Sequence, residues 1–447
     1  MELLLGNPKT AIRKLSGPLM ISMIITSIYN LVDGIWVAGL GADALAGVGF
    51  VTPLFLILIG LGNGLGAGAT ASISRYIGQK RKDKADNGAI HSIILTIIIS
   101  LIIMILLLIL MKPVLIVMGA GQTLSYAIEY GTIMFTGTVL FVLPNSMYGI
   151  LRAEGDVTRT MYAMAISGIL NMILDPIFIY LLGMGVSGAA YATIISTTTV
   201  IFVLYYWIYI KKDTYLKPFK SNFKFSQEIT KDILGVGLPA SLEMVMTAVF
   251  AAVFSALLTI VASTDAVAVY STCWRVITLG VMPIVAISTA LVSVVGANYG
   301  ARRFKNIQTA QRYSILLSLL ASVIIGLIIL IFAPQIVYLF SYSEKSAHLS
   351  ATMIEFLITM IPFFFCTAIG APSTLTFQGL GKGITAMIQT LMRQLIFSLI
   401  FSYIFAMVLT MGEHGAWYGI IAGQLTACII TFIWSSTYIN RLIKNSS

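Results

Sequence analysis

Residues 101–110 read LIIMILLLIL, and they lie inside an apolar run that covers residues 89–111. About 20 apolar residues in a helix cross the hydrocarbon core of a bilayer, and runs of this length recur along the whole chain. A transmembrane β-barrel would instead show short segments of alternating polarity. The sequence therefore predicts an all-α, polytopic membrane protein, with the lipid bilayer as its surroundings.

The composition excludes several other classes of protein. Of the 447 residues, 58% are hydrophobic and only 10% are charged, whereas soluble proteins carry about 25% charged residues. This excludes a soluble enzyme and a disordered chain, and it leaves no reason to expect a nucleic-acid partner. The three cysteines lie inside apolar segments and do not form a disulfide framework.

Twelve apolar segments are long enough to span a membrane. We read the first as an uncleaved spanning helix, because its apolar run is too long for a signal peptide. The twelve predicted spans are 16–38, 45–74, 89–111, 125–148, 159–182, 187–210, 233–262, 265–296, 309–332, 347–371, 384–409 and 414–439.

The basic residues orient these spans. With the N-terminus placed in the cytoplasm, 24 of the 27 Lys and Arg residues fall on the cytoplasmic side, including Arg393. Lys112 and Lys345 fall on the outer side, and Arg275 lies within a span. Because cytoplasmic loops carry an excess of Lys and Arg, we expect a protein of the cytoplasmic membrane with both termini inside the cell. The net charge of +10 is then explained by the excess of Lys and Arg in the cytoplasmic segments.

The two halves of the chain resemble each other weakly but in order. YIGQKRKDK (76–84) aligns with NYGARRFKN (298–306) at an offset of 222, and DALA (43–46) aligns with DAVA (265–268) at the same offset. We therefore predict two six-helix lobes, 1–210 and 233–447, joined by a cytoplasmic linker, 211–232. An even number of helices per repeat gives both lobes the same orientation, so a pseudo-two-fold axis should run along the membrane normal.

Two carboxylates inside the first lobe are candidates for a functional site. Asp33 and Asp175 both lie about 23 Å from the cytoplasmic face, at 1.5 Å per helical residue, and Tyr130 and Thr193 fall at a similar depth. Asn171 lies one turn from Asp175, on the same face of the helix. Charged residues inside a membrane are costly and indicate function by default.

The surroundings of this pair favour a small hard cation. Asn30 shares a helix face with Asp33, and Pro176 should kink its helix and free a carbonyl group. Oxygen ligands without His or Cys suit H⁺ or Na⁺, with Asp33, Asp175, Asn171 and Thr193 as the Na⁺ ligands, and they do not suit a transition metal. The alternative is a structural polar network of protonated Asp side chains.

The second half holds another set of charged residues within its spans. Glu243 and Arg275 are predicted at mid-depth on adjacent helices, and Glu355 lies on a third. They form either an interhelical ion pair or a second site for coupling or substrate recognition.

Several segments resemble the multidrug and toxic compound extrusion (MATE) family. They are IYNLVDGIWVAGLGADALAGVGF (28–50), RAEGD (152–156), NMILDPIFIY (171–180), GVSGAAYATIIS (185–196), GLPASLE (237–243) and GANYGARR (296–303). The resemblance covers essentially the whole chain and is strongest to the prokaryotic DinF-like branch.

This resemblance implies alternating-access export of amphiphilic organic cations by antiport with H⁺ or Na⁺, with no cofactor. It implies a cation-coupling network in the first lobe that contains Asp33, Asn171, Asp175, Tyr130, Asn145 and Thr193. We expect a monomer and no enzymatic activity. A flippase for lipid-linked or other small molecules of related twelve-helix fold is the alternative function.

Overall fold

The computed structural model describes residues 2–218, 223–341 and 348–445, and these contain helices and no strands. Lys220, Lys345 and residue 347, the first of the predicted tenth span, lie outside the described residues. Within the described ranges, eleven helices are long and apolar enough to cross a membrane, and one further bent pair of helices counts as a twelfth span. The prediction of twelve spans is therefore confirmed.

The first half of the chain forms the following helices: α1 (Glu2–Leu5), α2 (Pro8–Ala38), α3 (Ala42–Gly78), α4 (Lys82–Val117), η1 (Gly121–Thr123), α5 (Leu124–Thr136), α6 (Thr138–Glu154), α7 (Val157–Pro176), η2 (Ile177–Leu181), α8 (Gly185–Tyr205) and η3 (Tyr206–Lys211). Most of these helices extend beyond the predicted spans, because their polar ends continue past the apolar segment.

The second half repeats this order: α9 (Gln227–Val261), α10 (Thr264–Gly300), α11 (Phe304–Ser341), α13 (Ser350–Thr359), α14 (Ile361–Gly379), α15 (Gly383–Leu391), η5 (Met392–Phe397), α16 (Ser398–Tyr403), η6 (Ile404–Val408) and α17 (Gly412–Lys444). The first residues of α9 lie within the predicted linker, so 227–232 are helical.

Two spans are broken at equivalent points of the repeat. The fourth span bends by 48° at Gly137, between α5 and α6. The tenth span breaks at Met360, between α13 and α14, just before Pro362. Gly137 weakens the helix at the first break, because Gly has high conformational freedom. Pro362 weakens it at the second, because Pro lacks an amide donor.

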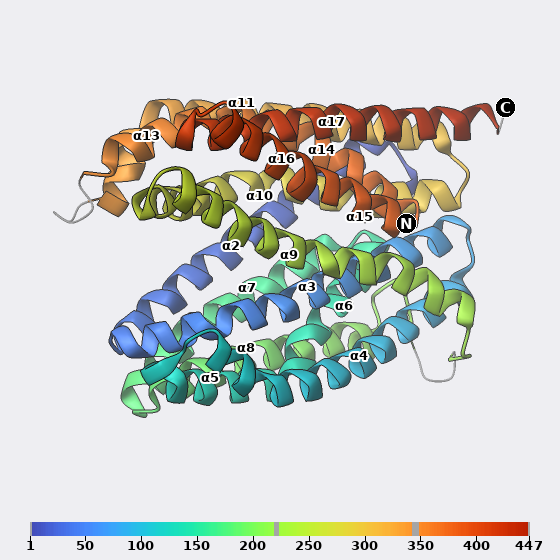
Figure 1. The fold of residues 1–447 in the computed structure, drawn as a ribbon. Helices are drawn as coiled ribbons and strands as arrows, with labels where there is room; N and C mark the ends of the chain where they lie inside the picture. The colour runs from blue at the N-terminus through green and yellow to red at the C-terminus, as the bar shows by residue number, and fades with distance from the viewer. Residues whose placement is uncertain (1, 219–222, 342–347, 446–447) are drawn as a thin grey trace.

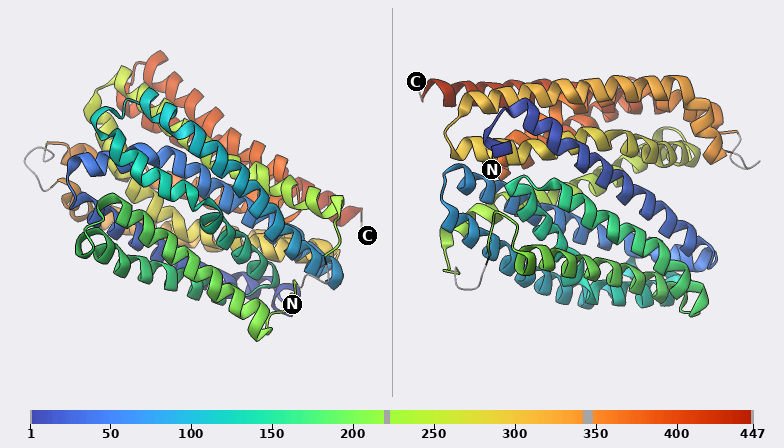
Figure 2. Two further views of the ribbon diagram at one scale, coloured as in Figure 1. Left: turned by 90° about the horizontal axis from the view of Figure 1, so that it is seen from below. Right: turned by 180° about the vertical axis from the view of Figure 1, so that it is seen from behind.

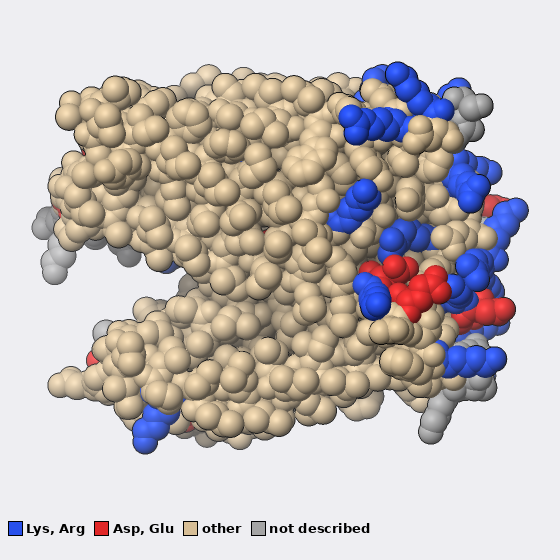
Figure 3. Space-filling view, turned by 45° about the vertical axis from the view of Figure 1, so that its right-hand side comes forward, with Lys and Arg blue, Asp and Glu red and all other residues tan. Residues whose placement is uncertain are grey.

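The two halves form two lobes that meet at one end of the molecule. The views in Figures 1 and 2 show α3–α8 on one side and α10–α17 on the other, diverging towards the end away from the two termini. Figure 3 shows the molecule hollowed between the lobes at this end, which we call the open end. Lys and Arg side chains gather at the other end, which we call the basic end.

The lobes meet at the basic end through equivalent residues of the two repeats. A Cβ atom on Gly78 of α3 would lie 1.9 Å from the carbonyl oxygen of Ala297, and one on Gly300 of α10 would lie 2.0 Å from that of Arg75. At an offset of 222, Gly78 corresponds to Gly300 and Arg75 to Ala297, so each contact mirrors the other. This reciprocity places the pseudo-two-fold axis at the crossing of α3 and α10.

The segment that links the two lobes is hydrogen-bonded to the first lobe. The buried carboxylate of Glu154 accepts a hydrogen bond from the backbone N–H of Leu216 at 2.9 Å, and Asp86 accepts one from Lys217 at 2.8 Å. The backbone N–H of Ser226 donates to Nε2 of the buried His91 at 3.0 Å. Described parts of the predicted linker are thus held in place by hydrogen bonds.

Candidate functional site

The two carboxyl groups singled out in the sequence lie together. Asp33 is on α2 and Asp175 is at the end of α7, and these two helices pack side by side. The two carboxyl groups are close enough to interact electrostatically. Asp175 is fully buried and Asp33 is partly buried. Two carboxylates that lie close together repel each other, so this arrangement favours binding of a proton or another cation.

Asn171 links this pair to a neighbouring helix. Its side-chain Nδ2 donates to Oδ1 of Asp175 at 3.4 Å and to Oγ1 of Thr193, on α8, at 3.3 Å. The Thr193 hydroxyl donates in turn to the carbonyl of Ala189 at 3.1 Å. The predicted grouping of Asn171, Asp175 and Thr193 therefore exists as a hydrogen-bonded chain between α7 and α8.

Tyr130 adds a side chain from a fourth helix to the cluster. It lies on α5, its side chain is buried, and it interacts electrostatically with both Asp33 and Asp175. Tyr29, on α2, interacts with Tyr130 and Asp33 in the same way and was not singled out in the sequence. The structure therefore brings together side chains from four helices around the carboxyl pair.

Three oxygen atoms in this cluster are buried without a donor. Asp33 Oδ1, Asn171 Oδ1 and Asp175 Oδ2 accept no hydrogen bond from any group in the described part of the chain. Buried acceptors are costly unless they are satisfied, and three such acceptors in one cluster fit a bound cation or proton. The described residues contain no group of three or more His, Cys, Asp and Glu side chains that could hold a metal ion.

Pro176 lies where α7 changes its helical form. The α-helix ends at this residue and continues as a π-helical turn, η2, over Ile177–Leu181. Pro has no amide donor, so the preceding turn loses a hydrogen bond. Tyr180 of η2 then donates its hydroxyl to the carbonyl of Trp36 on α2 at 2.6 Å. The carboxyl pair is thus adjacent to the residue at which α7 changes its helical form.

Two predicted members are not brought into this cluster. Asn30 is exposed, and nothing in the described ranges hydrogen-bonds to its side chain. Asn145 donates to the carbonyl of Phe141 on its own helix at 3.2 Å and lies against Gly62 of α3. No hydrogen bond within the described ranges joins either asparagine to Asp33 or Asp175.

The second-half site differs from the prediction. Glu243 of α9 accepts a hydrogen bond from Gln378 Nε2 of α14 at 3.3 Å, and its charged neighbour is Arg393 of η5. Arg275 is exposed and pairs with no acidic group in the described part of the chain. The predicted Glu243–Arg275 pair is therefore wrong. Arg275 and Arg393 both lie on helices that contact α9. Depth within the membrane alone could therefore not decide which of the two arginines lies beside Glu243.

Arg393 also corrects the count of cytoplasmic charges. It is buried in the middle of the eleventh span, with 9% of its surface exposed, and it does not lie in a cytoplasmic segment. Its position within the predicted span 384–409 was the signal that could have identified it. Glu355 lies apart from this site and pairs with His414 at 3.0 Å, with both side chains exposed.

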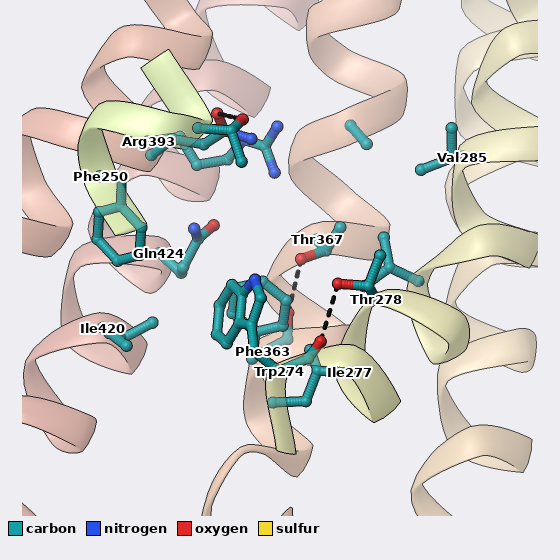
Figure 4. A pocket seen from close by; sticks show the side chains of 14 residues that line it. Phe250, Trp274, Ile277, Thr278, Val285, Phe363, Thr367, Arg393, Ile420 and Gln424 are labelled. Carbon is teal, nitrogen blue, oxygen red and sulfur yellow. Dashed lines mark hydrogen bonds between the residues drawn. The ribbon is translucent and has the colours of Figure 1, made fainter. Parts of the chain in front are cut away.

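A cavity of about 200 Å³ adjoins Arg393 in the second lobe. Figure 4 shows Phe250, Trp274 and Phe363 around it, together with Arg393 and Gln424. The remaining lining residues are apolar or carry hydroxyl or amide groups: Thr247, Ile277, Thr278, Val281, Val285, Thr367, Ala371, Gln394 and Ile420. Apolar and aromatic walls with a few polar groups are typical of small-molecule sites.

A two-lobed bundle of twelve spans, hollowed between the lobes and holding carboxyl groups inside the membrane, defines a membrane transporter. The MatE family model matches residues 18–177 and 239–404, which is more than half of the chain. The chain therefore belongs to the MATE family of multidrug efflux transporters, as its sequence motifs predict, and it is not an enzyme.

Named relatives and solved structures agree with this assignment. The chain is 27% identical over 416 residues to the probable multidrug resistance protein NorM of Thermotoga maritima, covering 92% of this chain and 88% of that protein. It is 26% identical to the multidrug export protein MepA of Staphylococcus saprophyticus, covering 84% and 83%. An outward-facing MATE transporter of the MOP superfamily superposes with a TM-score of 0.96 at 41% identity, covering 99% and 98%. A MOP superfamily transporter from Pyrococcus furiosus gives the same values.

Proposed function

We propose that this transporter exports amphiphilic organic cations by antiport with H⁺ or Na⁺. The observation that carries the proposal is the pair of carboxyl groups, Asp33 and Asp175, with buried oxygen atoms that have no donor in the described part of the chain. Neither carboxylate forms an ion pair with a Lys or Arg among those residues. A cation that enters the first lobe can therefore neutralise the pair.

Neutralisation would be coupled to movement through α7. An ion shifts a conformational equilibrium only if it binds one conformation more tightly than the other. With the carboxyl groups uncharged, α2 and α7 can approach closely, and the π-helical turn after Pro176 provides the place where α7 bends. The site would thereby link ion entry to a change in the space between the lobes.

A second candidate is a carrier of anionic or neutral amphiphiles, such as a lipid flippase. Arg393 favours it, because this arginine adjoins the aromatic cavity of the second lobe and its Nε atom has no partner among the described residues. Glu243 offsets this charge, and the carboxyl pair of the first lobe favours the cation antiporter.

The two functions can be separated in proteoliposomes. We expect an ethidium-like cationic dye to leave the compartment against its gradient when either a pH gradient or a Na⁺ gradient is imposed alone. The ion whose gradient supports efflux is the coupling ion. If neither gradient moves the dye, but a fluorescent phospholipid is translocated, the flippase is correct and the antiporter is wrong.

We further propose that the basic end faces the cytoplasm and that the chain works as a monomer. Lys305, at the basic end, and Lys112, on the opposite side, are both exposed. In intact cells, an impermeant maleimide should label Lys112→Cys and leave Lys305→Cys unlabelled until the membrane is opened. The native cysteines are buried and give little background. The reverse labelling pattern would contradict this orientation.

A further inference from the structure

A second cavity lies at the basic end, where the two lobes meet. Its volume is about 840 Å³, and it is lined by two turns that join consecutive helices, residues 78–81 between α3 and α4 and residues 299–304 between α10 and α11. Leu5 of α1 and Leu442 of α17 complete its wall. We call it the seam pocket.

Four cations and no carboxylate line the seam pocket. They are Lys80 and Arg81 from the first lobe and Arg302 and Arg303 from the second. In the described part of the chain, none of the four forms a salt bridge. Arg81 is within electrostatic range of Glu228, but Lys84 already pairs with that carboxylate at 2.6 Å. One guanidinium nitrogen of Arg303 donates to the carbonyl of Leu5 at 2.6 Å.

The four cations are related by the internal repeat. At the offset of 222, Lys80 corresponds to Arg302 and Arg81 to Arg303. The two turns have the same backbone form, because Lys80 and Arg302 both adopt positive φ, at 61° and 56°. The backbone N–H of Arg81 donates to the carbonyl of Tyr76, and that of Arg303 donates to the carbonyl of Asn298. The pocket therefore presents two equivalent pairs of cations across the pseudo-two-fold axis.

Topology alone does not produce this arrangement. The positive-inside rule accounts for basic residues on the cytoplasmic side. Basic residues scattered over any of the cytoplasmic loops would satisfy this rule equally well. Here the charges converge from two lobes on one cavity whose lining contains no acidic residue. The helices α4 and α11 also begin at its rim, and the N-terminus of a helix favours a negative charge.

We propose that the seam pocket binds one anion that carries a phosphate group, held between the lobes. Arg and Lys side chains recognise phosphate through charge-assisted hydrogen bonds, and an anionic headgroup of the neighbouring leaflet or a free phosphate both provide this group. Leu5, Tyr299, Phe304 and Leu442 give the pocket an apolar side that suits a phospholipid.

The position of the site gives the anion an effect on conformation. Its two walls belong to different lobes, so the site is complete only while α3 and α10 are in contact at the basic end. A ligand that binds only this arrangement stabilises it. We therefore expect the bound anion to stabilise the closed form of the basic end. This part of the inference rests on the proposed function, because it assumes that the basic end opens and closes during transport.

Binding is tested on the purified full chain in a neutral detergent, at constant ionic strength. Calorimetric titration with dihexanoyl phosphatidylglycerol should show one site, and dihexanoyl phosphatidylcholine should show none. In Lys80→Asn/Arg302→Asn, affinity should fall about 20- to 30-fold, since each cation near an anionic headgroup contributes about 1 kcal/mol. Asn is chosen because it tolerates positive φ.

The matched control removes the same charge outside the pocket. Lys231→Gln/Lys305→Gln replaces two exposed cations that do not line it, and it should bind as the wild type does. Inorganic phosphate binding as tightly as phosphatidylglycerol would assign the site to free phosphate. Equal affinity in the Lys80→Asn/Arg302→Asn variant and the wild type, or no binding of either anion, would overturn the proposal.

The conformational effect has a separate readout that requires no transport. Ser293 of α10 is buried, and Ser293→Cys should react more slowly with a soluble maleimide when phosphatidylglycerol is present. Unchanged reactivity with binding intact would contradict the effect on conformation and leave the antiport proposal untouched. If the double variant does not remain monodisperse, the single variants Lys80→Asn and Arg302→Asn are compared with each other, and each should weaken binding.

Discussion

Asp33→Asn is expected to reduce ion-driven dye efflux to the level measured without an ion gradient, and Asp175→Asn is expected to do the same. Each substitution removes the negative charge that would attract the coupling ion, and it keeps the size of the side chain. The pair would then resemble its neutral state permanently, and ion binding could no longer shift the conformational equilibrium. Folding should be preserved, because an uncharged amide is less costly in this environment than a carboxylate.

The measurement is efflux from proteoliposomes at equal protein content, with two control variants. Asn30→Ala lies on the same helix as Asp33 but is exposed and outside the cluster, so it should transport as the wild type does. Glu243→Gln should lose less than either Asp variant, because Glu243 already has Gln378 and Arg393 as neighbours. Wild-type efflux from both Asp variants would show that the pair is a structural polar network. A loss in Glu243→Gln as large as in Asp33→Asn would move the coupling site to the second lobe.

The sequence predicted the members of this cluster that helical spacing and depth can specify. Asn171 and Asp175 are one turn apart, so their shared face follows from the helix itself, and Thr193 falls at the same depth. The prediction for Asn30 was wrong for a related reason. A spacing of three residues places Asn30 near Asp33, but it does not determine which of the two side chains faces α7. The orientation of a helix about its own axis depends on packing, which a single sequence does not reveal.

The partner of Glu243 shows the same limit. Arg275 and Arg393 both lie within predicted spans, and only the relative placement of α9, α10 and η5 selects Arg393. Gly137 marks the first break and Pro362 the second, but Pro18 and Pro53 lie inside unbroken helices, so these residue types alone do not select the two places. By contrast, hydropathy was sufficient for the number of spans, because it depends on local composition. The ordered sequence matches at an offset of 222 were sufficient for the repeat.

Gly300→Val is expected to prevent the basic end from closing. A Cβ atom at residue 300 would lie 2.0 Å from the carbonyl oxygen of Arg75, whereas real Cβ contacts essentially never fall below 3.0 Å. That oxygen belongs to the backbone of α3 and cannot rotate away as a side chain could. The crossing of α3 and α10 must therefore widen by roughly 1 Å for the Cβ alone, and the two methyl groups of Val widen it further. Small residues allow close approach of membrane helices for this reason.

Two observations should follow from this widening. Ser293→Cys, buried in the closed arrangement, should react faster with a soluble maleimide in the Gly300→Val background. Dye efflux should fall to background, because alternating access requires the basic end to close in each cycle. Gly78→Val should behave in the same way, since its Cβ would lie 1.9 Å from the carbonyl oxygen of Ala297 by the equivalent contact.

Gly49→Val is the matched control on α3. A Cβ atom at residue 49 meets no atom within 4 Å, so this substitution adds the same two methyl groups without touching the other lobe. It should retain both efflux and slow labelling of Ser293→Cys. If Gly300→Val is monodisperse and labels at the control rate, the helices tolerate the side chain by another movement and the crossing is not the closing contact. Because the two glycines are equivalent in the repeat, a defect at one and not the other would likewise contradict a gate on the pseudo-two-fold axis.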